Sequence, residues 1–151
     1  MDENFPEGVS RDWRHGDCYA MAMALSEALG WPVATLSVTL APCSRRHAGC
    51  TDHVVHAWVR APDGRSFDAG GFFDDADLHG TFLDHPTRKF SDVRVEEFAD
   101  VPAFRRHLDA TFGGNEEWHA FAPHLERRRT VALAIAEERI VPTVAGVSPT
   151  P

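Results

Sequence analysis

The spacing of apolar residues predicts a buried helix near the start of the chain. Between residues 16 and 30 the apolar positions recur every three or four residues in an alanine-rich run, at Met21, Leu25, Ala28 and Leu29. Asp17 supplies a side-chain oxygen that can cap the N-terminus of this helix. Gly30, followed by Trp31-Pro32, gives a stop signal.

Later segments change to an alternating pattern, which indicates strands. Residues 33–40 alternate and are rich in β-branched side chains. Residues 53–60 and 65–68 predict a hairpin joined through Ala61-Pro62-Asp63-Gly64, and residues 89–95 predict a further strand. Strict alternation along the first hairpin strand predicts that Val54 and His56 share one face, with His53, Val55, Ala57 and Val59 on the other.

The last third of the chain is predicted to be helical, over residues 102–112 and from 115 or 116 to 141. The second helix carries an apolar stripe suited to packing, made of Leu125, Val131, Ala132, Ile135 and Ala136. Residues 142–151 contain three prolines and are predicted to be a disordered tail. These patterns together predict a single α+β domain over residues 1–141.

Composition limits the classes of partner. A chain of 151 residues with 43% hydrophobic residues is enough for one core. The net charge of -8 argues against nucleic acid or an anionic membrane as a partner, and Arg127-Arg128-Arg129 is predicted to be a solvated helix face. No apolar run approaches the roughly 18 to 20 residues of a membrane span, so we expect a cytoplasmic protein. The oligomeric state is left open.

Three residues suggest thiol chemistry. Cys18 lies in the first turn of the predicted helix, where backbone N–H groups and the helix dipole favour a thiolate and can stabilise an oxyanion. His56 would act as the base, and Asp68 would orient its imidazole. Each residue also has an ordinary interpretation: a buried unreactive cysteine, a strand histidine and a turn acceptor.

These segments resemble a known superfamily. Gly16-Asp17-Cys18 at the head of a helix, then His56-Ala57-Trp58-Val59, then Phe67-Asp68 after an Asp63-Gly64 turn, is similar to the Cys, His, Asp order of transglutaminase-like and papain-like thiol enzymes. Asp68-Ala69-Gly70-Gly71-Phe72 also resembles a segment of arylamine N-acetyltransferases. The resemblance covers about residues 13 to 73. The chain has no Gln, so the side chain that papain-type enzymes place in their oxyanion hole is absent.

The resemblance implies a cysteine-proteinase-like fold, in which the cysteine helix packs on an antiparallel sheet and a helical C-terminal part covers the rest. It implies acyl transfer or hydrolysis through Cys18, His56 and Asp68 on a peptide, protein or small acyl substrate, with no cofactor. The alternative is a non-enzymatic binding module, either a degenerate relative or one stabilised by zinc. The zinc ligands would be Cys43, His47, Cys50 and His53, although their spacing matches no common structural zinc motif.

Overall fold

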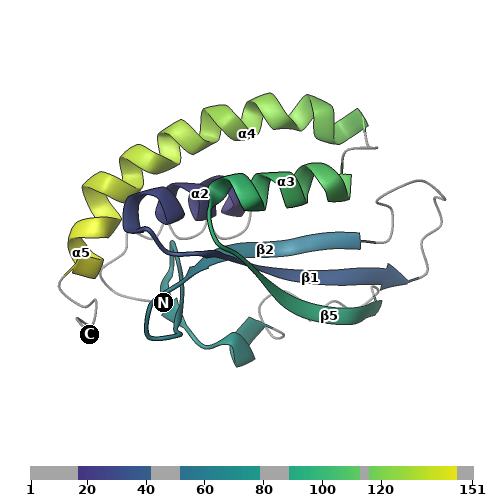
Figure 1. Ribbon diagram of the computed structural model, residues 1–151, viewed down its shortest axis with the longest axis horizontal. Helices are drawn as coiled ribbons and strands as arrows, with labels where there is room; N and C mark the ends of the chain where they lie inside the picture. Colours follow the sequence, from purple (N-terminus) through teal and green to yellow (C-terminus); the bar gives the residue numbers. More distant parts are fainter. Residues whose placement is uncertain (1–16, 42–51, 79–88, 113–115, 146–151) are drawn as a thin grey trace.

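The computed structural model describes residues 17–41, 52–78, 89–112 and 116–145. In this part the protein is α+β, with an open five-stranded antiparallel sheet and helices stacked on one of its faces (Figure 1). The predicted fold class is therefore confirmed at the level of an α+β domain with an antiparallel sheet.

The sheet has the strand order β4-β3-β2-β1-β5. Its strands are β1 (Val33–Ala41), β2 (Asp52–Arg60), β3 (Ser66–Asp68), β4 (Gly71–Phe73) and β5 (Lys89–Phe98). The helices are α2 (Cys18–Leu29), α3 (Val101–Phe112), α4 (Glu116–Ile135) and α5 (Val141–Ala145), with a 3-10 turn η1 (Asp75–Asp77) and a π-helical segment η3 (Ala136–Ile140).

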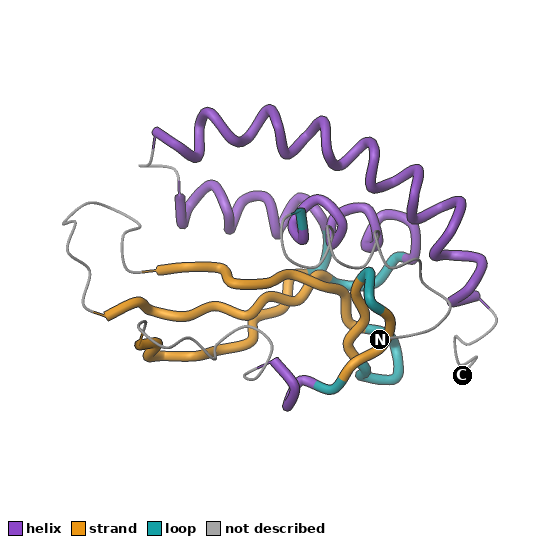
Figure 2. Tube along the Cα trace, turned by 180° about the vertical axis from the view of Figure 1, so that it is seen from behind, coloured by secondary structure: helices purple, strands orange, loops and turns teal. Residues whose placement is uncertain are grey.

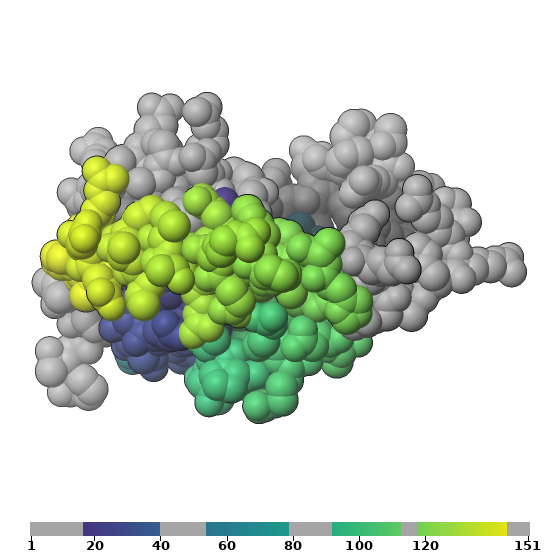
Figure 3. All heavy atoms as spheres, turned by 90° about the horizontal axis from the view of Figure 1, so that it is seen from above, coloured from purple at the N-terminus to yellow at the C-terminus, as the bar shows by residue number. Residues whose placement is uncertain are grey.

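The helices form two layers above the sheet. Both side views place α2 and α3 next to the strands and α4 outside them (Figures 1 and 2). Helix α2 contacts both β2 and α4, and Met21, Met23 and Leu25 are almost completely buried between them. Seen from above, α4 forms the outermost layer (Figure 3). The start of α2 is therefore held between the sheet and α4.

The stop signal of α2 works as the sequence predicts. Gly30 adopts a left-handed conformation with φ 74°, and its N–H donates to the carbonyl of Ser26. The chain then enters β1 through Trp31, which is buried against the core. A residue with a side chain would be strained at Gly30, so the helix ends here for a conformational reason.

A β-bulge in β2 overturns the face assignment predicted from alternation. Leu36 of β1 pairs with His56, but the next residue, Ser37, pairs with Val54, so Val55 is an extra residue in β2. Val54 and Ala57 pack on the side of α2, whereas Val55 packs with a second apolar cluster on the opposite face, formed by Ala34, Leu36, Trp58 and Leu78. The prediction that Val54 and His56 share a face is therefore wrong.

The C-terminal helices extend further than predicted. Leu125, Ala132 and Ala136 are buried as expected, but Val131 is 44% exposed and does not belong to the packing stripe. Residues 142–145, which we expected in a disordered tail, form part of α5, which follows η3 without a break, and Val144 is buried. None of the helices in the described ranges is both long enough and apolar enough to cross a bilayer.

Candidate active site at the start of helix α2

A buried imidazole and carboxylate are hydrogen-bonded on the face of the sheet opposite α2. His56 Nε2 lies 2.9 Å from Asp68 Oδ2, and both residues are at least 98% buried. The ring of His56 stacks on Trp58, with centroids 5.7 Å apart and planes inclined by 23°. Asp68 Oδ1 also accepts a hydrogen bond from the N–H of Gly70, at 2.8 Å. Packing on Trp58 thus holds the His56 ring, and the Gly70 N–H holds the Asp68 carboxylate.

The hairpin between β2 and β3 brings these two residues together. The turn closes with the Gly64 N–H donating to the Ala61 carbonyl, and the strands pair at Val59 with Phe67 and at Arg60 with Ser66. Because Phe67 packs on the α2 side, Asp68 is turned to the other face, where the bulge has also turned His56. The structure thus brings His56 and Asp68 together, and their roles as base and orienting residue stay predictions.

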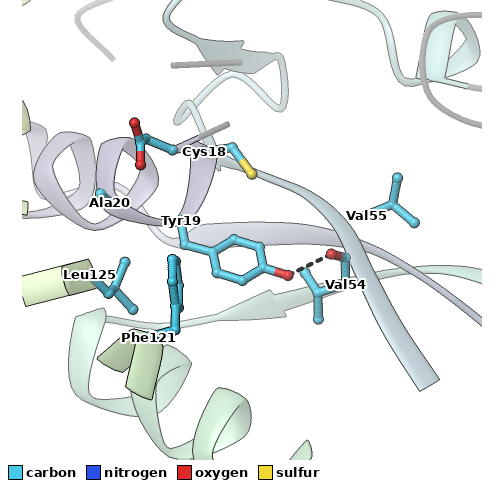
Figure 4. A pocket seen from close by; sticks show the side chains of 8 residues that line it. Cys18, Tyr19, Ala20, Val54, Val55, Phe121 and Leu125 are labelled. Carbon is cyan, nitrogen blue, oxygen red and sulfur yellow. Dashed lines mark hydrogen bonds between the residues drawn. The ribbon is translucent and has the colours of Figure 1, made fainter. Parts of the chain in front are cut away.

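The sulfur of Cys18 lies beside β2, at the level of the sheet. Successive backbone N–H groups of a strand point to opposite sides. The Arg60 N–H donates to the Pro32 carbonyl, on the β1 side, and the Ala61 N–H donates to the Arg65 carbonyl across the hairpin. The Ala57 N–H therefore points to the same side as that of Ala61, which is the β3 side. The described β2–β3 pairing does not extend as far as Ala57. There the Ala57 N–H acts on the thiol of Cys18 and lowers its pKa. Figure 4 shows this sulfur directed towards β2.

Asp17 does not cap the helix with its side chain, which corrects the sequence prediction. Its backbone has φ -110° and ψ 32°, and its carboxylate makes no capping hydrogen bond. Instead Asp17 Oδ2 accepts hydrogen bonds from Nε and Nη2 of Arg128, at 3.2 and 3.1 Å. The backbone N–H groups of Cys18 and Tyr19 are therefore not taken by the Asp17 side chain, and both act on the Cys18 thiol.

The thiol itself is not ionised by its surroundings, contrary to the expectation from its place in the helix. Burial raises the pKa of Cys18 to about 12, and the nearby Asp68 carboxylate adds to the increase. The N–H groups of Ala57, Cys18 and Tyr19 lower the pKa but do not outweigh burial. The helix terminus is therefore insufficient on its own, and a thiolate here needs a group that accepts the proton.

A pocket opens next to the sulfur. It has a volume of about 230 Å³ and is lined by Asp17, Cys18, Tyr19, Ala20, Val54, Val55, Phe121 and Leu125. Figure 4 shows the Tyr19 hydroxyl directed at β2. That hydroxyl donates to the Val54 carbonyl at 2.6 Å. The pocket therefore combines the first turn of α2 with apolar side chains from β2 and α4.

Comparisons with known proteins identify no relative. No family model matches the chain, and neither the curated proteins nor the solved structures contain a match.

The sequence did not indicate the contribution of α4. Arg128, predicted to be part of a solvated arginine face, is paired with Asp17, and Arg129 is paired with Glu27 of α2. Phe121 and Leu125 line the pocket, although Leu125 was expected only as packing. These residues are more than 90 positions from Cys18, and no local spacing links them to it.

The alternative zinc site falls mostly outside the described residues. Cys43, His47 and Cys50 lie between residues 42 and 51, and of His53 only the backbone, in β2, is described. Within the described ranges no group of three or more His, Cys, Asp or Glu side chains is arranged to hold a metal ion. The zinc hypothesis stays a prediction from the sequence.

Proposed function

We propose that this protein is a cysteine-dependent acyltransferase or hydrolase in which Cys18 is the nucleophile, His56 the proton acceptor and Asp68 the residue that orients His56. The observation that carries the proposal is the buried 2.9 Å hydrogen bond between His56 and Asp68, next to the point on β2 where the Ala57 N–H reaches the Cys18 sulfur. A helix headed by the cysteine and packed on an antiparallel sheet also supports the resemblance to transglutaminase-like and papain-like enzymes.

The chemistry would run in two steps on an acyl substrate R–CO–X. The sulfur attacks the carbonyl carbon, His56 takes the thiol proton, and the C–X bond breaks as that proton passes to X, which leaves as HX. Water or an amine then attacks the thioester and gives a proton to His56, and the sulfur leaves and recovers that proton. The acid or amide is released, and the thiol is restored.

The oxyanion of each step would be stabilised by backbone N–H groups near the sulfur. Those of Cys18 and Tyr19 belong to the first turn of α2, and Ala57 supplies a third from β2. Donors on two separate elements give a site of fixed geometry, which is the property that makes such stabilisation effective. This arrangement does without the glutamine side chain of papain-type enzymes.

A second candidate is a non-catalytic domain that keeps this fold. The observation that favours it is the pKa of Cys18, which burial raises to about 12. A thiol with that pKa is almost entirely protonated at neutral pH, as in an ordinary buried cysteine. The two candidates differ in one testable respect, which is whether His56 removes the proton when an acyl group is presented.

Trapping the acyl-enzyme tests the proposal. The full chain is incubated with S-phenyl thioacetate, and the acetyl group on Cys18 and the acetate released are measured by mass spectrometry and chromatography. We expect acetylation of Cys18 with turnover, loss of both in His56→Ala, and a decrease in rate of about 100-fold or more in Asp68→Asn.

The matched control is Asp77→Asn, at an exposed carboxylate of η1, which should keep the wild-type rate. Cys18→Ser reports any acetylation at other residues. If Cys18 is not acetylated, or if it is acetylated equally in His56→Ala, the proposed function is wrong and the non-catalytic candidate is favoured.

A further inference from the structure

The pocket beside Cys18 limits which acyl groups could reach the sulfur, so it carries an inference about substrate class that depends on the proposed function. Its walls come from three elements: the first turn of α2, Val54 and Val55 of β2, and Phe121 and Leu125 of α4. The side chains from β2 and α4 are all apolar, whereas the polar N–H groups belong to the end at Cys18. A carbonyl at the polar end would direct its chain against the apolar walls.

No unpaired charge of the described residues faces this pocket. The Asp17 carboxylate at its rim is paired with Arg128, with the carboxylate side chain 21% and the guanidinium 32% exposed. Burial raises the pKa of Tyr19 well above its ordinary value, so the phenol stays neutral, and its hydroxyl is engaged by the Val54 carbonyl. A negatively charged chain would meet Asp17 without gaining a partner, which favours a neutral occupant.

The volume of the pocket limits the size of the acyl group that it can hold. A buried cavity of about 150 Å³ is sufficient for benzene, and this pocket has about 230 Å³. It therefore holds a ring or a chain of about six carbons together with the carbonyl. A polycyclic group or a long fatty chain would exceed this volume.

We propose that the pocket beside Cys18 binds the acyl part of the substrate and selects a neutral, apolar acyl group no larger than about a benzoyl or hexanoyl group. Phe121 closes the side of the pocket formed by α4, so its ring limits the size of the acyl group. It is only half-buried, so it can be truncated with less effect on the core than a fully buried residue. Leu125 is 1% exposed and serves the core as well as the pocket wall.

Covalent probes test this without requiring turnover. Methanethiosulfonates carrying methyl, benzyl, 2-sulfonatoethyl or 1-pyrenylmethyl groups react with a thiolate to form a mixed disulfide and release methanesulfinate. The rate at Cys18 is measured by mass spectrometry, and each rate is divided by that of the same reagent with glutathione. We expect the normalised benzyl rate to exceed the sulfonatoethyl and pyrenylmethyl rates by about tenfold or more.

Two phenylalanine variants form a matched pair. Phe121 and Phe112 are both half-buried and both pack against Trp118, but only Phe121 lines the pocket. Phe121→Ala should raise the normalised pyrenylmethyl rate several-fold, and Phe112→Ala should leave it unchanged. Phe121→Leu is the milder truncation to use should Phe121→Ala fail to fold.

The outcomes separate the two proposals. If the sulfonatoethyl reagent reacts as fast as the benzyl reagent, or if the two alanine variants behave alike, the inference about the pocket is wrong even where thioester turnover is observed. If the selectivity is found but no thioester acylates Cys18, the pocket inference stands and the proposed catalysis fails.

Discussion

The pH dependence of Cys18 alkylation is the most direct test of whether His56 serves the thiol. Burial raises the pKa of Cys18 from an ordinary 9.0 to about 12. At about 1.4 kcal/mol for each pH unit, this makes the thiolate about 4 kcal/mol less favourable. Without help, only about one molecule in 10⁵ would carry a thiolate at pH 7, about 10³-fold fewer than at the ordinary pKa.

Two pH profiles follow from these numbers. An unassisted thiol reacts only as thiolate, so its alkylation rate rises tenfold with each pH unit up to about pH 12. If His56 accepts the proton, the rate stops rising once the imidazole is neutral, so the profile shows a plateau. We expect the plateau in the wild type, and in His56→Ala a continuous slope with a rate at pH 7 lower by up to about 10³-fold.

The assay is iodoacetamide labelling between pH 6 and pH 10, with folding checked by circular dichroism at each pH. Cleavage after glutamate separates Cys18 from Cys43 and Cys50, because Glu27 lies between them. His107→Ala is the control, since this histidine packs on Phe98 of the sheet, away from the pocket. A slope without a plateau that is the same in the wild type and His56→Ala would refute the assignment of His56 as proton acceptor.

Two further substitutions test how α2 is held. Arg128→Met removes the two hydrogen bonds to the Asp17 carboxylate next to Cys18 and leaves it only the more distant His124, 3.9 Å away. We expect slower alkylation of Cys18 and a loss of about 0.5 to 1 kcal/mol in urea unfolding. Exposed Arg127→Met is the control, and equal effects of the two substitutions would contradict a specific role of the pair. Gly30→Ala should lower the free energy of unfolding by about 1 to 2 kcal/mol in the same assay, because Ala is strained in the left-handed backbone conformation of Gly30. An added Cβ meets no atom within 4 Å, so no steric clash contributes. An unchanged unfolding midpoint would show that the helix end relaxes.

The sequence predicted those helices and strands whose ends are determined by local residue chemistry. Gly30 ended α2 as expected, and the Asp63-Gly64 turn joined β2 to β3 in the predicted hairpin. Gly71, with φ 105°, begins β4 shortly after β3 ends at Asp68. In each case a glycine supplied a conformation that other residues adopt at a cost, so one position decided the structure.

Contacts between distant segments could not be predicted in this way. The pair between Asp17 and Arg128 joins residues 111 positions apart, and each residue has a sufficient local interpretation, as a helix cap and as part of a solvated arginine run. The depth of burial of Cys18 depends on how β2 and α4 close over α2, which the periodicity of α2 alone does not reveal. The raised pKa of the thiol was missed for the same reason.

The bulge at Val55 explains how a cysteine above the sheet and a histidine below it could belong to one site. A regular strand turns alternate side chains to opposite faces, which would put His56 on the same face as Val54. The extra residue keeps Val54 against the core under α2 while His56 turns to Asp68 on the other face. The sulfur lies at the sheet level beside Ala57, where the described β2–β3 ladder has ended. Deletion of Val55 would make Val54 and His56 consecutive residues of a regular strand, so the two side chains would still point to opposite faces and His56 would stay beside Asp68. We therefore expect iodoacetamide to label Cys18 in this variant with the same pH profile as in the wild type. A folded deletion variant that has lost the plateau would contradict this account of the bulge.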